Sequence, residues 1–317
     1  MHKLWSVKKL LMIALFVVFA FGRLSAETNI WQPSPGHTQV PIWPGAVPDP
    51  QPVEGPEFLT NAPARLNVAG KPWVSVGNVS QPTMTVYSPK GTNTGVAVVV
   101  FPGGGYWALA IDLEGTEICD WLTSKGITGV LLKYRVPHSG PHRLREPKAP
   151  TALQDAQRTM GLMRLNAAKW HINPQKIGVI GFSAGGHLVA AVSTRFELRL
   201  YPAVDAADKE SCRPDFAIAV YPGHLWKGNK NLGLNPTIPV TSNTPPTFLL
   251  QAENDPVDDV YHALSYYIAL KEAKVPVELH LYAEGGHAFG LRRTKSQITG
   301  WPQLVETWMR TIGMISD

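Results

Sequence analysis

Gly181-Phe182-Ser183-Ala184-Gly185 lies between a predicted buried strand and a predicted helix. The strand is the β-branched run at residues 176–180, and the helix continues through the small and apolar residues 186–192. Glycine two residues before and two residues after the serine suits a sharp strand-to-helix turn, because larger side chains there would collide with the backbone. Such a turn raises the serine hydroxyl clear of the sheet. The stretch therefore predicts Ser183 as a nucleophile.

Strands and helices alternate on both sides of this turn. Several predicted strands are continuous apolar runs, of which residues 96–101 are the clearest, and such runs indicate burial on both faces of a parallel sheet. The pattern predicts an α/β fold, with a mostly parallel central sheet and helices on both faces. Predicted strands cover residues 83–87, 95–101, 128–134, 176–181, 215–221, 247–252 and 277–282, and predicted helices cover residues 112–124, 149–169, 185–194, 258–273 and 301–312.

The N-terminus has the pattern of a targeting segment. Three lysines precede an apolar run at residues 10–21, and Leu24-Ser25-Ala26 offers a cleavage site, so residues 1–26 are predicted to be a signal peptide. A signal anchor is the alternative, although the run is shorter than the roughly 20 apolar residues that span a bilayer. We therefore expect a secreted or periplasmic protein, without stable membrane insertion after cleavage.

The charge balance depends on this segment. The whole chain has 29 Lys and Arg against 24 Asp and Glu, a formal charge of +5. Four of the basic residues and none of the acidic ones precede residue 27, so the formal charge of the remainder is +1. A nearly neutral body gives no support to nucleic acid or a membrane surface as a partner.

A proline-rich arm is predicted at residues 27–82, before a catalytic domain at residues 83–317. Proline removes backbone donors and favours extended chain, so regular helix is not expected in the arm. Trp31, Trp43 and Trp73 indicate that the arm packs on the body, since mobile linkers usually lack such residues.

The chain has two cysteines, Cys119 and Cys212, and their pairing is left open because geometry decides it. Buried free thiols are the simpler interpretation. No His/Cys cluster has the spacing of a zinc site, so no metal is expected.

Ser183 needs a histidine base that is itself oriented by a carboxylate. Where the serine lies at a strand-to-helix turn of a parallel sheet, the chain order is serine, acid, histidine, each following a strand. His287 follows the strand at residues 277–282 and is the predicted base. Asp255, after the strand at residues 247–252, is the predicted acid. The alternative acids are Glu253, Asp258 and Asp259, of which the last two would also serve as the N-cap of the next helix.

A tetrahedral intermediate also needs amide donors for its negatively charged oxygen. Pro102-Gly103-Gly104-Gly105-Tyr106 follows a buried strand, and successive glycines can expose their amides to a ligand. Ala184 supplies the amide just after the nucleophile. A phosphate-binding loop is excluded, because no Lys-Ser/Thr pair follows and the Gly-x-Gly-x-x-Gly spacing is absent.

With these motifs the sequence resembles the α/β-hydrolase superfamily, near its hormone-sensitive-lipase-like and acetyl-xylan/feruloyl-esterase-like branches. The resemblance implies that Gly104 and Gly105 are oxyanion donors. Pro102 stands where the lipase-like branch usually has histidine, which favours the carbohydrate-esterase branch. The resemblance also implies that Asp155 and Arg158 are structural. The matching pieces lie at residues 101–106, 153–158, 181–187, 255–257 and 285–287.

Four residues are candidates for binding substrate: Tyr106, Trp107, His224 and Trp226. Aromatic faces near an ester pocket suit a sugar ring or an aromatic acyl group, and core packing explains the aromatic residues about as well. His187, by contrast, is expected to pack, because its side chain on the helix would point away from the hydroxyl.

The predicted function is that of a secreted serine carboxylesterase. Its substrate would be a small ester or an acylated carbohydrate, with acetyl groups on xylan or oligosaccharides favoured, and it would need no cofactor. The alternatives are a feruloyl esterase and, from another class, a non-catalytic sugar-binding protein on a hydrolase scaffold. The sequence does not indicate the oligomeric state.

Overall fold

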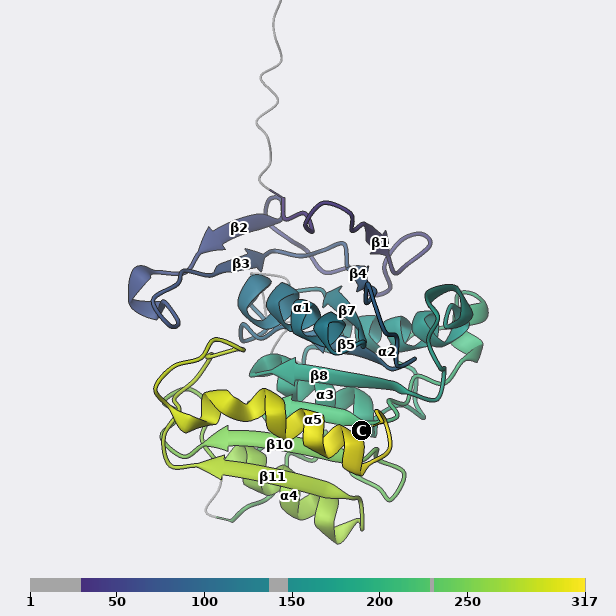
Figure 1. Cartoon of the computed structure of the whole chain (residues 1–317). Coiled ribbons are helices and arrows are strands. Elements are labelled where there is room, and N and C mark those ends of the chain that lie inside the picture. The colour runs from purple at the N-terminus through teal and green to yellow at the C-terminus, as the bar shows by residue number, and fades with distance from the viewer. Residues whose placement is uncertain (1–29, 137–147, 229–230, 317) are drawn as a thin grey trace, which may run out of the picture.

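The computed structural model describes residues 30–136, 148–228 and 231–316. The predicted signal peptide lies outside these ranges. An eight-stranded sheet crosses the molecule in the order β1-β4-β7-β5-β8-β9-β10-β11 (Figure 1). Its strands are β1 (Gln39–Pro41), β4 (Thr83–Tyr87), β5 (Ala97–Phe101), β7 (Thr128–Lys133), β8 (Ile177–Phe182), β9 (Ala217–Val220), β10 (Thr247–Ala252) and β11 (Val277–Tyr282).

The central strands run parallel to one another, from β7 across to β11, while β1 and β4 pair antiparallel. Every residue of β5, β7, β8, β9 and β10 is buried, as expected for apolar strands covered on both faces. The predicted α/β fold with its mostly parallel sheet is therefore confirmed. Because parallel strands end on the same side, the loops after β5, β8, β10 and β11 meet at one edge of the sheet.

Helices cover both faces of the sheet. Figure 1 shows α1 and α5 together on one face and α2, α3 and α4 on the other. The rings of Trp121 on α1 and Trp301 on α5 lie 5.5 Å apart. The helices are α1 (Glu117–Ser124), α2 (Pro150–Leu165), α3 (Ala184–Thr194), α4 (Tyr261–Glu272) and α5 (Trp301–Thr311).

Two predicted helices differ from those observed. The helix expected at residues 112–124 begins as a π-helical turn, Asp112–Thr116, before α1. The helix expected from residue 258 begins at Tyr261 instead. Both differences lie beside the site described below. None of the helices within the described ranges has the length and apolar character needed to cross a bilayer.

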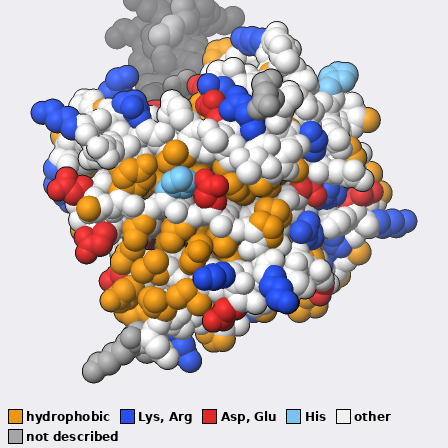
Figure 2. All heavy atoms as spheres, turned by 60° about the horizontal axis from the view of Figure 1, so that its bottom comes forward, with side chains coloured by type: hydrophobic (Ala, Val, Ile, Leu, Met, Phe, Trp, Pro, Cys, Tyr) orange, Lys and Arg blue, Asp and Glu red, His pale blue; other side chains and the backbone are white. Residues whose placement is uncertain are grey.

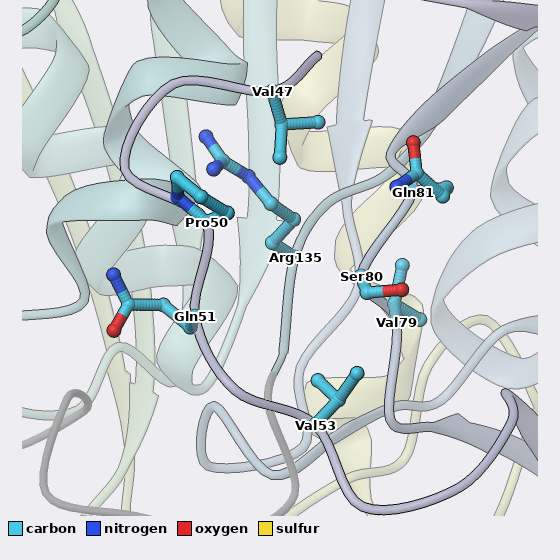
Figure 3. Close-up of a pocket in the computed structure, with 8 residues that line it drawn as sticks. All are labelled: Val47, Pro50, Gln51, Val53, Val79, Ser80, Gln81 and Arg135. Carbon is cyan, nitrogen blue, oxygen red and sulfur yellow. The ribbon is translucent and has the colours of Figure 1, made fainter.

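The N-terminal arm packs on the body and takes part in both of its sheets. It contributes β1 to the edge of the main sheet and two strands, β2 (Phe58–Asn61) and β3 (Val74–Gly77), to a small antiparallel sheet completed by β6 (Ala108–Leu109). Arg135 stands between the arm near Pro50 and the loop at residues 79–81, at a hollow of about 210 Å³ (Figure 3).

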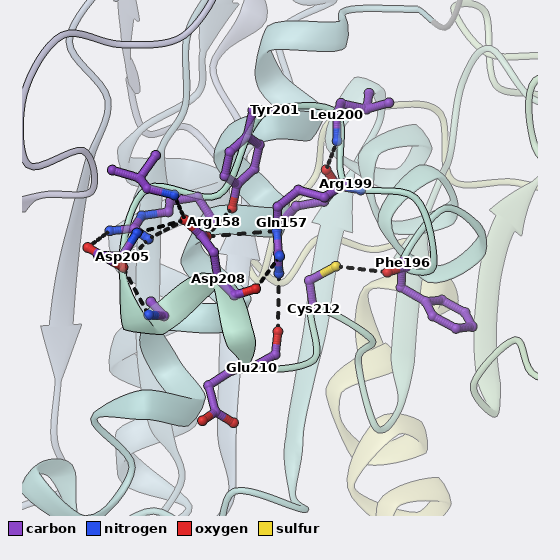
Figure 4. Close-up of polar contacts among 12 residues, drawn as sticks. Gln157, Arg158, Phe196, Arg199, Leu200, Tyr201, Asp205, Asp208, Glu210 and Cys212 are labelled. Carbon is purple, nitrogen blue, oxygen red and sulfur yellow. Dashed lines mark hydrogen bonds and ion pairs between the residues drawn. The ribbon is translucent and has the colours of Figure 1, made fainter.

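Two charged residues of α2 hold the arm. Asp155 accepts a hydrogen bond of 2.9 Å from the Trp43 indole nitrogen, and Arg158 Nε donates to the carbonyl oxygen of Ile42 at 2.8 Å. The guanidinium of Arg158 also donates to both oxygens of Asp205, at 2.7 and 2.6 Å (Figure 4). The structural role that the resemblance implied for Asp155 and Arg158 thus includes anchoring the arm.

Both cysteines are buried and free.

At the opposite end of the sheet from the arm, β11 is an edge strand. Figure 2 shows hydrophobic side chains gathered on the end of the molecule where β11 and α4 lie in Figure 1.

Candidate active site

Ser183 sits at the sharp turn between β8 and α3. Its backbone has φ 52° and ψ −119°, a conformation that is strained for a residue with a side chain. The turn is tight enough that a Cβ at position 185 would overlap the carbonyl oxygen of Phe101, so Gly185 permits the close approach of α3 to β5. The carbonyl oxygen of Ser183 accepts the amide of Gly223, which ties the turn to the loop after β9. The turn therefore holds the Ser183 hydroxyl at the carboxyl edge of the sheet.

His287 and Asp255 form a close pair at the same edge. Asp255 Oδ2 lies 2.7 Å from His287 Nδ1, and Asp255 Oδ1 accepts the amides of Val257 and Asp258 at 2.8 and 3.0 Å. Gln251 Nε2 donates to Asp255 Oδ2 at 3.2 Å. The carboxylate is thus fixed from three directions, and it orients His287 so that Nε2 is the nitrogen left to act as the base.

A second carboxylate, that of Asp258, lies between the serine and the histidine. Asp258 Oδ2 accepts a hydrogen bond of 3.2 Å from Ser183 Oγ and lies 3.8 Å from His287 Nε2. Both reactive atoms are therefore within 4 Å of one oxygen. For attack on a carbonyl, the Ser183 hydroxyl has to turn from Asp258 to His287, and catalytic hydrogen bonds often tighten in this way only when substrate is bound.

The three carboxylates around His287 raise its pKa. Burial alone would lower the pKa of the imidazole, but the hydrogen bond to Asp255 and the negative charges of Asp255, Asp258 and Glu114 outweigh it. The pKa of Asp258 is also raised, because burial disfavours its charge more than His287 and His262 favour it.

The candidate oxyanion donors lie beside Ser183. Within the described chain, the amides of Gly104, Gly105 and Ala184 donate no hydrogen bond to another protein group. Gly104 and Gly105 line the same pocket as the serine. Free amides beside a nucleophile are what a developing oxyanion needs.

Glu114 holds the glycine loop through a hydrogen bond. Its Oε2 accepts the amide of Gly103 at 2.7 Å, and its Oε1 accepts the hydroxyl of Tyr221 at 2.9 Å. The Tyr221 oxygen in turn accepts the amide of Gly290 at 3.2 Å, three residues after His287. Glu114 thus connects the oxyanion loop to the histidine loop. It belongs to the π-helical turn before α1, a kind of irregularity that is common at functional sites.

The pocket at Ser183 has a volume of about 380 Å³. Besides the residues above, it is lined by Trp73 from the arm, by His224 and by Val257, which is 65% exposed. Among the described residues, no group of three or more His, Cys, Asp or Glu side chains is arranged to hold a metal ion.

The predicted substrate-binding residues are placed differently from one another. His224 lines the pocket. Tyr106 is 1% exposed, and its hydroxyl is 2.7 Å from His187 Nδ1, so it packs beneath the site instead. Trp107 is 39% exposed next to Gly105, and it is not among the residues lining the pocket.

Trp226 also lies outside the pocket lining. Its ring centroid is 4.8 Å from that of Tyr261, at the start of α4. The loop that carries Trp226 is held to this helix, because the amide of Trp226 donates to His262 Nδ1 at 2.8 Å.

Sequence reasoning did not assign Trp73 and Glu114 to the site, and it gave Asp258 only as an alternative acid. Trp73 was expected only to pack, and its place in the pocket depends on how the arm folds back. Glu114 follows the glycine loop by nine residues and carried no motif. Asp258 was considered as an acid and as a helix cap. Its location in the loop after a strand of the sheet was the sequence feature that indicated a position at the site.

The sequence matches the family BD-FAE over residues 84–222 and the prolyl oligopeptidase family over residues 155–312. It is 31% identical over 219 residues to an acetylxylan esterase of Xylanibacter ruminicola, and this match covers 62% of this chain and 42% of that protein. It is 30% identical over 244 residues to an arylesterase of Saccharolobus solfataricus, which covers 68% of this chain and 75% of the relative. The chain thus spans less than half the length of the acetylxylan esterase.

Among solved structures, the chain is similar to an acetyl ester-xyloside bifunctional hydrolase from Caldicellulosiruptor lactoaceticus, with a TM-score of 0.66 and 30% sequence identity. The match covers 88% of this chain and 97% of the other. Together with the serine turn and the Asp255–His287 pair, these similarities show that the chain belongs to the α/β-hydrolase superfamily, in the esterase branch that includes acetylxylan-esterase-like proteins.

Proposed function

We propose that this chain is a serine carboxylesterase that removes short acyl groups, acetyl among them, from carbohydrate. The observation that carries the proposal is that Ser183 and His287, whose ring is oriented by Asp255, meet at one pocket. Beside them lie three amides that donate to no other described group. The similarity to an acetylxylan esterase and to an acetyl ester-xyloside hydrolase supports acetylated carbohydrate as the substrate class.

The reaction proceeds in two halves. His287 Nε2 takes the proton of Ser183 as its oxygen attacks the ester carbonyl, and the amides of Gly104, Gly105 and Ala184 receive the oxyanion. The carbon–oxygen bond to the alcohol then breaks, and His287 gives its proton to the departing alcohol oxygen. His287 next takes a proton from water, which attacks the acyl-enzyme, and the acid leaves as Ser183 regains its proton. Asp255 stabilises the imidazolium throughout.

Substitution of the nucleophile tests the mechanism. Ser183→Ala is expected to abolish hydrolysis of p-nitrophenyl acetate without changing the thermal unfolding midpoint by more than a few degrees. Turnover by Ser183→Ala at the wild-type rate would refute it.

A substrate panel tests the acyl and alcohol assignments. We expect release of acetate from acetylated xylan or xylo-oligosaccharides and falling activity as the chain of p-nitrophenyl esters lengthens. Activity confined to long-chain esters would contradict the carbohydrate assignment, and activity confined to methyl ferulate would identify a feruloyl esterase.

Export is part of the proposal and rests on the sequence of residues 1–26. Expression of the full chain in a bacterial host should yield periplasmic or secreted protein that lacks this segment by intact mass. Full-length mass in the cytosol would contradict export.

A further inference from the structure

The carboxylate of Asp258 has a position that the hydrolytic mechanism does not require. Its Oδ2 lies 3.2 Å from Ser183 Oγ and 3.8 Å from His287 Nε2, and it lines the pocket. We propose that Asp258 accepts a hydrogen bond from a hydroxyl group on the alcohol part of the substrate, next to the ester oxygen. The site would then select esters of polyols, such as sugars, over esters of simple alkanols. This inference rests on the proposed function and names the feature of the alcohol that is recognised.

Asp258 is not needed to begin the helix that follows it. The amide of Tyr261, the first residue of α4, donates to Asp259 Oδ1 at 2.9 Å, and the residue in the cap position is Val260. In the described chain, the hydrogen bond from Ser183 is the only one that the Asp258 carboxylate accepts. The side chain is therefore free of a helix-capping duty.

The backbone nevertheless directs this carboxylate into the site. The amide of Asp258 donates to Asp255 Oδ1 at 3.0 Å, and its carbonyl oxygen accepts Gln251 Nε2 at 2.8 Å. Position 223 leaves room for the carboxylate, because a Cβ on Gly223 would overlap both of its oxygens. The position of Asp258 is thus determined by groups on three separate segments.

The location corresponds to the alcohol side of the ester. His287 Nε2 has to come within hydrogen-bond reach of the departing alcohol oxygen in order to protonate it. Since Asp258 Oδ2 is 3.8 Å from that nitrogen, it lies near the same oxygen. A hydroxyl on the neighbouring carbon of the alcohol can then donate to the carboxylate. The oxyanion donors belong to the glycine loop and to Ala184, so they do not compete for this hydroxyl.

Attack on the ester leaves the carboxylate in need of a donor. Once Ser183 Oγ is bonded to the carbonyl carbon in the tetrahedral intermediate, it has no hydrogen to donate, the alcohol is still attached, and Asp258 is only 8% exposed to solvent. An ionised carboxylate can only accept hydrogen bonds. A substrate hydroxyl replaces the lost donor, whereas an alkyl group offers none, and sites built around a hydroxyl discriminate strongly against analogues that lack it.

A matched pair of esters tests the inference. 2-Hydroxyethyl acetate and propyl acetate differ by a hydroxyl in place of a methyl group, with the same acyl group. The wild-type kcat/KM is expected to favour the hydroxyethyl ester by about tenfold or more, in line with the loss of one partner of a buried charged hydrogen bond. In Asp258→Ala the ratio should fall to about one, because hydrolysis of the hydroxyethyl ester slows more than that of propyl acetate. Asp258→Asn, whose amide oxygen still accepts, should lie between the two.

Asp259→Asn is the matched control for Asp258→Asn, because it makes the same chemical change one residue later, in the turn before α4. It should keep the wild-type ratio. Thermal unfolding of each variant reports whether the fold is intact, and the ratio of the two kcat/KM values cancels any effect on Ser183 or His287 that both esters share.

The outcomes separate the two levels of the proposal. Ester hydrolysis with a ratio that Asp258→Ala leaves unchanged refutes the inference alone. Equal loss on both esters in Asp258→Ala also refutes it, because the carboxylate would then act on Ser183, His287 or water rather than on the alcohol. A wild-type chain that hydrolyses no ester refutes the proposed function and this inference with it.

Discussion

Glu114 offers a quantitative test of how the site is held together. Its side chain is 2% exposed and accepts two hydrogen bonds, from the amide of Gly103 and the hydroxyl of Tyr221. Glu114→Ala leaves both donors buried without a partner. Each unsatisfied donor costs about 1–3 kcal/mol, so the free energy of unfolding should fall by roughly 2–6 kcal/mol. That is a large share of the roughly 5–15 kcal/mol that keeps a domain folded.

The isosteric change Glu114→Gln is expected to be much milder. Burial raises the pKa of Glu114, against the opposing effects of His287, Tyr221 and Gly103, so the folded protein holds the charge less readily than water does. Gln can still offer its carbonyl oxygen to the Gly103 amide while its NH₂ group donates to the Tyr221 oxygen. We therefore expect a loss of less than about 2 kcal/mol.

Urea unfolding and hydrolysis of p-nitrophenyl acetate measure both effects. In Glu114→Ala the glycine loop and the histidine loop lose their common support, so kcat should fall by about tenfold or more even where the protein remains folded, because misplaced donors lose transition-state stabilisation. Glu114→Gln should recover most of both quantities. If Glu114→Ala unfolds within about 1 kcal/mol of the wild type and keeps its kcat, the proposed linkage between the two loops is wrong.

Three further predictions concern the charges, the pocket wall and the arm. Asp258→Asn removes a negative charge that raises the pKa of His287, so the acid limb of the kcat/KM profile should move to lower pH; an unmoved or upward-shifted limb would contradict this. Trp73→Ala removes an aromatic wall of the pocket and should raise KM for an acetylated xylo-oligosaccharide by about three- to tenfold, with a smaller effect for p-nitrophenyl acetate and recovery in Trp73→Phe; equal effects on both substrates would argue against a sugar contact. Arg158→Met strips the buried Asp208 carboxylate and the Ile42 carbonyl of their partner and should lower the free energy of unfolding by about 3–5 kcal/mol in urea titrations, whereas a change below about 1 kcal/mol would show that the arm is held by other contacts.

The sheet and the order of the functional loops could be predicted because they depend on local patterns. The predicted strands at residues 247–252 and 277–282 correspond to the full length of β10 and β11. Their positions place the loops that carry Asp255 and His287 after neighbouring parallel strands, as the fold requires. The serine turn was predictable for the same reason, since its glycines reflect backbone geometry.

The remaining parts of the site depend on side-chain direction and on distant segments. Asp258 and Asp259 are identical in type and adjacent, yet one enters the pocket and the other accepts the amide of Tyr261 at the start of α4. Tyr106 directly follows the glycine loop but turns inward to His187, because its ring is buried in the core. Trp73 reaches the pocket only because the arm folds across the body. No local pattern distinguishes these outcomes.

Covalent labelling with a fluorophosphonate, followed by peptide mass spectrometry, addresses the cooperation of the hydroxyl and the imidazole most directly. We predict one adduct, on the peptide that contains Ser183, and a labelling rate that falls by about 10³-fold or more in His287→Ala. An adduct on another residue, or equal labelling of His287→Ala and wild type, would contradict the view that these two side chains act together.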